Sequence, residues 1–378
     1  MLLATGSPGR GKSLATMMLA YHLALEGGRV MLVDPKGDLQ NCLNLTGVEV
    51  TSIPIHGSKA AGVLDPYHLH DDPAAAAVLA HTVLSMVLPT KLLHDNEALL
   101  LRVCDQVGRS GHPSMPAVVH ALHSHADPNA AALADSIEAT ANLDMGRLML
   151  GQPTSGDLTA TKLGRPAKPG IQIIDVSWLA NIGGTGTGTT VGQKLPYTVM
   201  YLVTLLVQQL AKRADRSMPA GVLIDEAHRI SKTDLGRDLL ISLTKLSRAQ
   251  NVVVMLATQN MADLLDERLM TSVGVHLAFG VNDLPEAGHI LKALQVSDTA
   301  HSRQDIVALR RGQAVMRDQY GRVGRIQVTP SPEVFRALTT TPPPRRRRDA
   351  IHQPDPDRPG TSSDGAEEPA DTGSRMLG

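Results

Sequence analysis

The sequence predicts an α/β fold in which a mostly parallel β-sheet is interrupted by an all-helical insert. Short, continuous apolar runs alternate with helical patterns along most of the chain, which is typical of parallel strands buried on both faces. A glycine-rich segment with the spacing of a phosphate-binding loop joins the first apolar run to the first helical pattern. Residues 71–165 differ, because they contain helical patterns alone.

The composition is that of an ordinary globular protein. The chain has 378 residues, of which 42% are hydrophobic and 19% charged, enough for one large domain or two ordinary ones. The net charge of −1 and the 2% of aromatic residues argue against a global basic field and against base stacking on aromatic platforms. Cys42 and Cys104 lack metal-binding spacing and indicate reduced, buried thiols. We expect no membrane span and no signal peptide.

The first part of the chain has a β-α-β-β order. The run LLAT predicts a short buried strand, and KSLATMMLAYHLALE predicts a helix that ends at Gly27 and Gly28. RVMLVD predicts the next strand, and the alternating segment VEVTSIPI predicts a third. We assign residues 1–70 to the core of the fold.

Helices and then strands follow. Helical segments separated by Pro, Gly and Asn fill the insert at residues 71–165, and the core resumes over residues 166–340. Strands are predicted at IQIIDVSWL, AGVLIDEAH, NVVVMLATQN and GVHLAFG, and a long helix at PYTVMYLVTLLVQQLAKRA. GQAVMRDQYGRVGRIQV predicts a terminal hairpin that turns near Gln319, Tyr320 and Gly321. Residues 341–378, rich in Pro, Gly, Ser and charge, predict a disordered tail.

The glycine-rich segment predicts a nucleotide site that takes ATP and Mg²⁺. Glycines in a G-x-x-x-x-G-K-S loop let backbone N–H groups curl around phosphates, and the helix that follows adds the positive end of its dipole. We expect Lys12 to contact the β- and γ-phosphates and the Ser13 hydroxyl to ligate Mg²⁺. The loop itself consists of Gly6, Ser7, Pro8, Gly9, Arg10, Gly11, Lys12 and Ser13.

Two further strand ends carry polar side chains toward the same edge. Asp225 ends the buried run GVLI, and carboxyl ends of parallel strands meet at one edge of a sheet. We expect Asp225 to hold Mg²⁺ and the adjacent Glu226 to act as the general base on the attacking water. Gln259, after the run VVVMLAT, is the candidate sensor of the γ-phosphate or orienter of water.

Other segments are less specific. VDPKGDL, in which Asp34 ends a strand and Lys36 follows, is either a plain turn or a loop beside the phosphate loop; the sequence leaves both open. His120, His123 and His125 lack ligand spacing for a shared metal, so we expect no metal site there. GGTGTGTT resembles a phosphate cradle but has no lysine, which favours a mobile loop.

In order along the chain, TGSPGRGKS, VDPKGDL, VLIDEAHRI and VVVMLATQN, with a helical insert between the second and third, resemble the FtsK–HerA superfamily of RecA-like motors. Within it, the chain looks most like the ATPases of conjugative and type IV secretion systems in high-GC Gram-positive bacteria. The resemblance covers about residues 1–341. It implies a P-loop NTPase that works as a homo-hexameric ring, cytoplasmic but peripheral to the inner face of the membrane. It would bind channel proteins there and transfer DNA or protein.

The resemblance also assigns roles to residues. Lys12 and Ser13 match the P-loop lysine and hydroxyl, Asp225 and Glu226 the second acidic motif, and Gln259 the polar sensor. An arginine from the neighbouring subunit would complete the site; Arg248 is the first candidate, followed by Arg310 and Arg311.

The sequence departs from the family at its start. Family members carry an amino-terminal region before the P-loop, whereas here the loop begins at Gly6. We therefore expect Met1 to be an internal residue of a longer motor whose upstream part supplies further strands, either because the chain is a fragment or because its start was assigned too late.

Other functions remain open. A double-stranded DNA pump or a coupling protein of the same superfamily would share the motor. A DEAH-type helicase would explain DEAH at residues 225–228 and GRVGR at residues 321–325, but the gap between them is too short for a second RecA-like domain. A nucleotide-dependent switch or a small-molecule kinase would not require Glu226 as a base.

Overall fold

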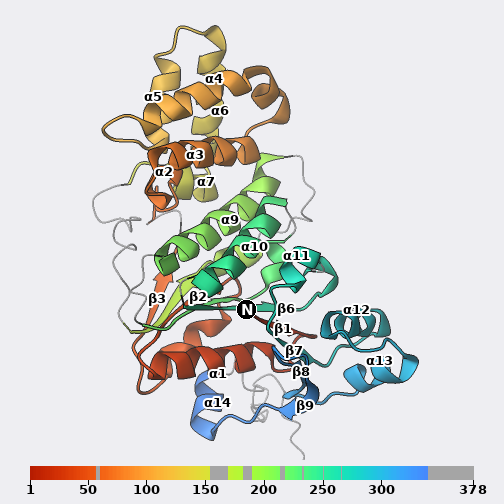
Figure 1. Ribbon diagram of the computed structural model, residues 1–378. Coiled ribbons are helices and arrows are strands. Elements are labelled where there is room, and N and C mark those ends of the chain that lie inside the picture. Colours follow the sequence, from red (N-terminus) through yellow and green to blue (C-terminus); the bar gives the residue numbers. More distant parts are fainter. Residues whose placement is uncertain are drawn as a thin grey trace, which may run out of the picture. The chain divides into compact units, whose positions relative to one another are not determined.

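The fold is organised by a nine-stranded sheet with the order β3-β4-β2-β5-β6-β1-β7-β8-β9. The structure is a computed structural model that describes residues 1–56, 60–153, 169–181, 190–212, 218–231, 234–249, 251–264 and 266–338 (Figure 1). Along this order, every pair of neighbouring strands from β3 through β7 is parallel. The last two pairs, β7 with β8 and β8 with β9, are antiparallel and form one edge of the sheet. The strands are Leu2–Thr5 (β1), Arg29–Asp34 (β2), Val50–Pro54 (β3), Gly170–Asp175 (β4), Ala220–Ile224 (β5), Val252–Thr258 (β6), Val275–Phe279 (β7), Gln313–Arg317 (β8) and Val323–Gln327 (β9).

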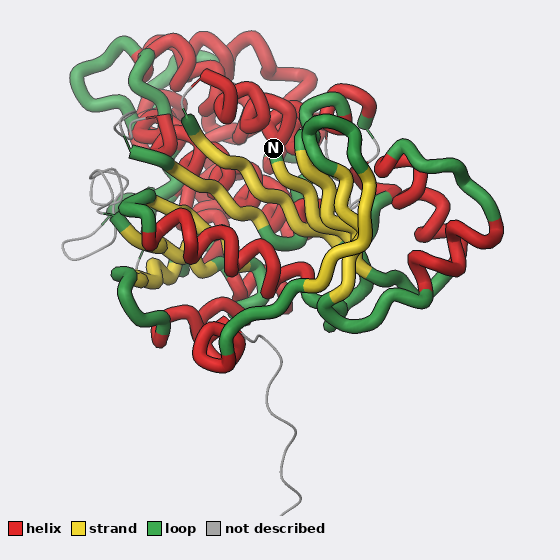
Figure 2. Tube along the Cα trace, turned by 60° about the horizontal axis from the view of Figure 1, so that its bottom comes forward, coloured by secondary structure: helices red, strands yellow, loops and turns green. Residues whose placement is uncertain are grey.

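Helices cover both faces of the sheet, as Figures 1 and 2 show. On one face, α1 and α14 pack on strand side chains such as Leu32 and Leu223. On the other, α9 and α10 pack on the alternate side chains, among them Val33 and Val222. Burial of successive residues on opposite faces explains the unbroken apolar runs. These helices span Lys12–Leu25 (α1), Val191–Lys212 (α9), Asp234–Ala249 (α10) and Pro332–Leu338 (α14).

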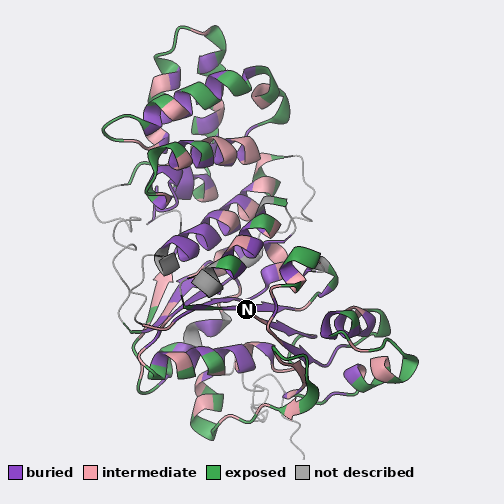
Figure 3. Ribbon diagram, viewed as in Figure 1, coloured by how far each residue is buried: buried purple, intermediate pink, exposed green. Residues whose placement is uncertain are grey.

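The insert is helical, and its apolar residues join the core of the sheet. Leu84 and Leu133 in the insert belong to the same cluster of buried residues as Leu202 in α9 and Val222 in β5, and buried residues run from the insert through α9 to the sheet in Figure 3. Residues Met1–Thr341 accordingly form one compact unit. The helices are Pro66–Leu69 (α2), Pro73–Val87 (α3), Thr90–Gly108 (α4), Met115–His123 (α5), Pro128–Ala141 (α6) and Asp144–Leu150 (α7).

The remaining elements are short. Helices α11, α12 and α13 flank β7 and span Glu267–Met270, Leu284–Leu294 and Ala300–Val307. Short 3₁₀ segments follow β2, β4, β5 and β6, at Asp38–Asn44, Ser177–Asn181, Ala227–Arg229 and Ala262–Leu264. The part of the chain that the structure describes has no helix long and apolar enough to cross a membrane.

The α/β class, the mostly parallel sheet and the terminal hairpin are confirmed. Asp318 shapes the hairpin turn, because its carboxylate accepts the backbone N–H groups of Tyr320 and Arg322. The strand predicted to end in Asp175 does end there. Two predicted helices have other limits: the helix predicted at 129–150 is two helices that break at Asn142 and Leu143, and the helix predicted at 196–214 starts at residue 191.

The limits of the predicted insert at residues 71 and 165 remain a prediction, as does an additional amino-terminal region. The glycine-rich loop predicted at residues 183–190 lies almost entirely outside the described residues, and so does the predicted tail at residues 341–378.

A buried carboxylate links the start of α2 to the start of α5. Asp65 is 2% exposed and accepts the backbone N–H groups of Tyr67, at the start of α2, and Met115, at the start of α5. Burial raises the pKa of Asp65 to about 7, against the effect of these two hydrogen bonds. The folded protein therefore favours the protonated carboxyl.

We predict that the contribution of Asp65 to stability falls as the pH rises from about 4 to about 7. The pKa of Asp65 is higher in the folded protein than its value of about 3.9 in the unfolded chain, so the protonated carboxyl stabilises the fold. This contribution is complete at a pH below the unfolded pKa, and it is lost as the pH rises through the folded-state pKa. The Tm of wild type minus the Tm of Asp65→Asn should therefore fall as the pH rises, because only wild type carries the titrating carboxyl. Thermal unfolding across this range measures it, with the exposed N-cap variant Asp72→Asn as control, and a value that rises with pH would contradict it.

Candidate nucleotide-binding and hydrolysis site

The site lies where four neighbouring parallel strands end at one edge of the sheet (Figure 1). Strand β2 ends in Asp34, β5 is followed by Asp225, β6 ends in Thr258, and β1 ends in Thr5, directly before the P-loop. The register aligns these ends: Val33 pairs with Ile224, Ile224 with Leu256, and Thr258 with Thr5. The polar groups predicted from separate motifs are therefore brought together by strand pairing.

The phosphate loop has a backbone that requires glycine. Gly6, Gly9 and Gly11 have φ angles of 137°, 73° and 115°, a region that side chains with a Cβ rarely adopt. A Cβ on Gly6 would also lie 2.8 Å from Cβ of Phe279 in β7. The absence of a side chain at Gly6 is thus needed both for the turn and for the close approach of β7.

Contacts from the loops after β7 and α13 hold the phosphate loop. Ser7 N–H donates to Gly280 O at 3.0 Å, and Gly312 N–H donates to Arg10 O at 2.9 Å. The Arg10 guanidinium donates to Leu309 O and to Asn282 Oδ1, each at 3.1 Å. Arg10 therefore anchors the loop to the segments after β7 and α13, a role that the loop motif alone does not specify.

Lys12 and the start of α1 provide the positive charge. Lys12 is 5% exposed, and its ammonium donates to the carbonyls of Gly6 at 2.6 Å and Ser7 at 3.0 Å. Burial lowers its pKa to about 8, opposed by the charges of Asp225 and Glu226. Gly11 is the N-cap and offers no side-chain cap, so the first N–H groups of α1 are suited to an anion.

Asp225 and Ser13 form the candidate Mg²⁺ site. Ser13 Oγ donates to Asp225 Oδ2 at 3.4 Å, and both groups offer the oxygen ligands that Mg²⁺ prefers. Asp225 is 4% exposed, and burial raises its pKa to about 6, opposed chiefly by the nearby charge of Lys36. A buried carboxylate of this kind is stabilised by a cation, so the two residues fit the ion.

Glu226 lies beside Asp225 in a strained conformation. Its φ of 54° is left-handed, which costs a residue other than glycine about 1–2 kcal/mol, and its backbone N–H donates to Asp225 Oδ1. Its carboxylate forms an ion pair with Lys36, accepts a hydrogen bond from Gln259 Nε2, and lies 3.1 Å from His228 Nδ1. Burial raises its pKa, but these contacts outweigh burial and leave the pKa below its usual value.

The strand end after β6 supports the same carboxylate. Gln259 reaches Glu226, so the structure brings together the predicted base and the predicted sensor. Thr258 Oγ1 lies 3.4 Å from His228 Nδ1 and accepts the backbone N–H of Asn260, which fixes the turn that carries Gln259.

The VDPKGDL segment lies at the site and is more than a plain turn. The Asp34 carboxylate accepts the backbone N–H groups of Lys36, Gly37 and Leu39 at 3.1, 2.9 and 2.9 Å. This turns the chain so that Lys36 reaches Glu226. Burial raises the pKa of Asp34, and the neighbouring Asp175 adds to the effect.

The candidate arginines are placed differently. Arg248 lies in α10, but its side chain falls outside the described part of the structure. Arg310 and Arg311 are exposed and directly precede Gly312, which contacts the P-loop of the same chain.

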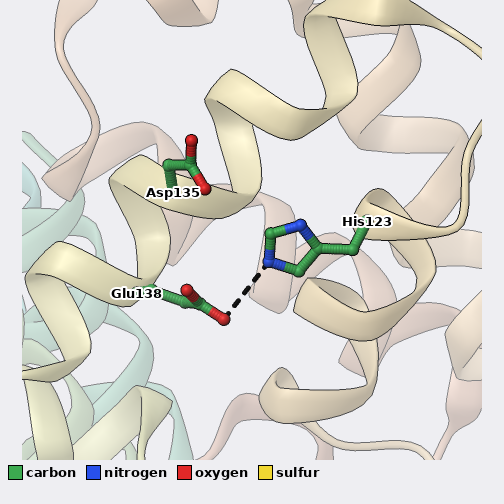
Figure 4. Close-up of side chains that lie close together, drawn as sticks. All are labelled: His123, Asp135 and Glu138. Carbon is green, nitrogen blue, oxygen red and sulfur yellow. Dashed lines mark hydrogen bonds and ion pairs between the residues drawn. The ribbon is translucent and has the colours of Figure 1, made fainter.

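The histidines of the insert lie far along the chain from this site. His123, at the end of α5, forms an ion pair with Glu138 of α6 at 3.2 Å, and Asp135 lies nearby (Figure 4). Their ligand atoms all lie within 4.8 Å of one another, but each side chain is exposed. His123 therefore gathers with carboxylates rather than with His120 and His125.

This combination of a parallel sheet, a phosphate loop and adjacent acids at the next strand ends defines a P-loop NTPase fold of RecA type. The chain belongs to the AAA-like domain family, whose model matches residues 1–338. No curated protein matches the chain in sequence.

Solved structures share the fold. VirB4 of Thermoanaerobacter pseudethanolicus superimposes with a TM-score of 0.69 at 17% identity, covering 88% of this chain and 90% of that one. The plasmid coupling protein TrwB in complex with ADP and Mg²⁺ superimposes with a TM-score of 0.57 at 15% identity, covering 87% and 85%. The resemblance to FtsK–HerA motors is thus confirmed, and the narrower assignment to high-GC Gram-positive bacteria stays a prediction.

Sequence reasoning missed Lys36 and His228 as partners of Glu226. A lysine two residues after a buried, strand-ending aspartate and before a glycine was the available signal for Lys36. His228 follows Glu226 by two residues, and only the 3₁₀ turn after β5 brings its ring back to the carboxylate.

We predict that Gly6→Ala destabilises the protein and weakens nucleotide binding. The new Cβ would overlap Phe279 and its carbonyl, and overpacking of this kind costs about 1–3 kcal/mol. Denaturant unfolding and titration with a fluorescent ATP analogue measure the two effects. Gly324→Ala, where nothing lies within 4 Å of the added carbon, is the matched control, and equal behaviour of both variants would contradict the prediction.

Proposed function

We propose that the protein is an Mg²⁺-dependent ATPase that powers DNA or protein transfer in a conjugative or type IV secretion-like system, as a homo-oligomeric ring. The observation that carries the proposal is the position of Glu226, a buried carboxylate adjacent to Asp225 and across the strand ends from Lys12 and Ser13. A phosphate loop that only binds nucleotide has no need of a second buried acid at this place.

Each residue has a chemical role in this proposal. Lys12 exchanges the carbonyls of Gly6 and Ser7 for the β- and γ-phosphate oxygens, to which it donates. Ser13 and Asp225 hold Mg²⁺, which neutralises charge on the phosphates when bound. Glu226 accepts the proton of the attacking water, and Gln259 orients that water.

The similar structures support the proposal without deciding the cargo. TrwB is a coupling protein of conjugation and has been obtained with ADP and Mg²⁺ and with an ATP analogue, and VirB4 gives the higher TM-score. We infer ATP as the nucleotide, a hexameric ring, and channel proteins as partners at the inner face of the membrane. A coupling protein or a double-stranded DNA pump is the second candidate, favoured by the TrwB match, and turnover that strictly requires DNA would identify it.

A helicase of the DEAH type is less well supported. The described residues contain a single large sheet, and the GRVGR segment lies in the turn and outer strand of the terminal hairpin. Strands β7 and β8 lie between β9, which carries Arg325, and β1, the nearest strand that ends at the nucleotide site.

We predict that Glu226→Gln keeps nucleotide binding but lowers kcat by about 10²–10⁴-fold, because the general base is lost. Lys12→Ala is the matched comparison, since it should abolish binding by removing the cation from the loop. Steady-state phosphate release and titration with a fluorescent ATP analogue separate the two effects. Wild-type turnover of Glu226→Gln would remove this residue from its role, and unchanged affinity of Lys12→Ala would remove the site.

We predict that Arg248→Ala impairs hydrolysis only in assembled protein. An arginine supplied by a neighbouring subunit stabilises charge on the transferred phosphoryl group, so its loss matters only where subunits meet. Turnover measured against protein concentration, together with sedimentation to determine the oligomeric state, tests this. Arg310→Ala is the comparison, and an equal loss in monomers would contradict a role in trans.

A further inference from the structure

Three side chains from two neighbouring helices of the insert come together on its surface. His123 is the last residue of α5, and Asp135 and Glu138 stand three residues apart on α6, so both carboxylates lie on one face of that helix (Figure 4). The ligand atoms of the three residues all lie within 4.8 Å of one another. An imidazole nitrogen and carboxylate oxygens are ligands of first-row transition metal ions, Zn²⁺ among them.

The backbone that carries these side chains is fixed by helix caps and by packing. The Ser114 side chain caps the start of α5, and the Asp127 side chain caps the start of α6. Leu122 and Ile137, each adjacent in the chain to one of the three residues, are fully buried in the core. Side chains on rigid helices keep a defined spacing, so an ion would require only rotations about side-chain bonds.

This surface is acidic and poor in permanent positive charge. Between Arg109 and Arg147 the sequence has no lysine or arginine, but it has four acids and four histidines. Asp135 and Glu138 place like charges on one face of α6. Glu138 also lies in the last turn of that helix, which has no basic residue to offset the negative end of the helix dipole. A divalent cation would offset both effects.

The ion pair between His123 and Glu138 does not account for the whole arrangement. The two side chains are 40% and 54% exposed, and ion pairs as exposed as this contribute little to stability. Asp135 takes no part in the pair: among the described residues, its carboxylate accepts no hydrogen bond and meets no cation. The position of Asp135 beside the other two is therefore the feature that a metal site explains and a surface ion pair does not.

The distances suit an ion after small side-chain rotations. Ligand atoms about 2.0–2.2 Å from a tetrahedral Zn²⁺ are about 3.4 Å from one another. His123 Nε2 lies 3.2 Å from Glu138 Oε1, and no separation in the cluster exceeds 4.8 Å. All three side chains are exposed, so they can close the remaining gap. Three protein ligands leave a further position for water.

We propose that His123, Asp135 and Glu138 form a surface site for a divalent transition metal ion, with Zn²⁺ as the fitting ion, and that the ion joins the end of α5 to α6. The spacing of His120, His123 and His125 argues against a metal shared by histidines alone, but the carboxylates of the next helix supply the missing ligands. The site is independent of the nucleotide site and of the proposed function.

The first experiment measures binding to the full chain without nucleotide, by calorimetry with Zn²⁺ and by visible absorption with Co²⁺, which reports the coordination of the ion. We expect saturable binding that Asp135→Asn and His123→Ala each weaken at least about tenfold. His120→Ala, at an exposed histidine one turn earlier in α5, is the matched control. Asp225→Asn shows whether the ion binds at the nucleotide site instead, and it should leave this affinity unchanged.

The proposal would be overturned if no saturable binding were found or if Asp135→Asn bound the ion as wild type does. A loss of binding in His120→Ala or in Asp225→Asn as large as that in Asp135→Asn would overturn it as well, because the ion would then lie elsewhere.

The second experiment reads the link between the helices by thermal unfolding. An ion that binds only the folded protein stabilises it, so Zn²⁺ should raise the Tm of wild type, and removal of the ion with a chelator should reverse the rise. In the chelator, Asp135→Asn should unfold at the wild-type Tm or slightly above it, because a like charge is lost from α6. A rise with Zn²⁺ that persists in Asp135→Asn would contradict the assignment.

Discussion

The site depends on the parallel pairing of β2, β5, β6 and β1. Parallel strands present their carboxyl ends at the same edge, and the register brings Asp34, Asp225, Thr258 and Thr5 to it. These residues are widely separated in the sequence and have no local tendency to meet. A slip of one residue in any pair would turn its side chains to the opposite face and separate the phosphate loop from the acids.

Charge balance is the second constraint at this edge. Asp225 and Glu226 are buried side by side, and like charges at this distance raise each other's free energy. Lys12 and Lys36 offset them, while hydrogen bonds from the backbone and from Gln259 satisfy the remaining oxygens. Such a cluster is costly to assemble without its cations. In the proposed function, nucleotide and its metal ion would therefore exchange partners with these side chains.

Much of this arrangement could be predicted from the sequence, because its signals are local. The glycine spacing before Lys12 and the apolar runs before Asp225 and Gln259 indicated the candidate site and correctly predicted the class of fold. The partners of Glu226 could not be predicted, since Lys36 and His228 reach it only through a turn held by Asp34 and a 3₁₀ turn after β5. The break between α6 and α7 was missed because the N-cap of α7 is Leu143, which has no side-chain cap to signal a helix start.

The continuous apolar core between the insert and the sheet has a mechanical consequence. Leu84 and Leu133 share their cluster with α9 and with Val222 in β5, so buried apolar contacts are continuous along this path. Close-packed interiors transmit strain and have low compressibility. We therefore expect the insert and α9 to move together as one rigid body rather than to bend at a hinge between them. A displacement at its far end would be felt at the base of the strand that carries Asp225.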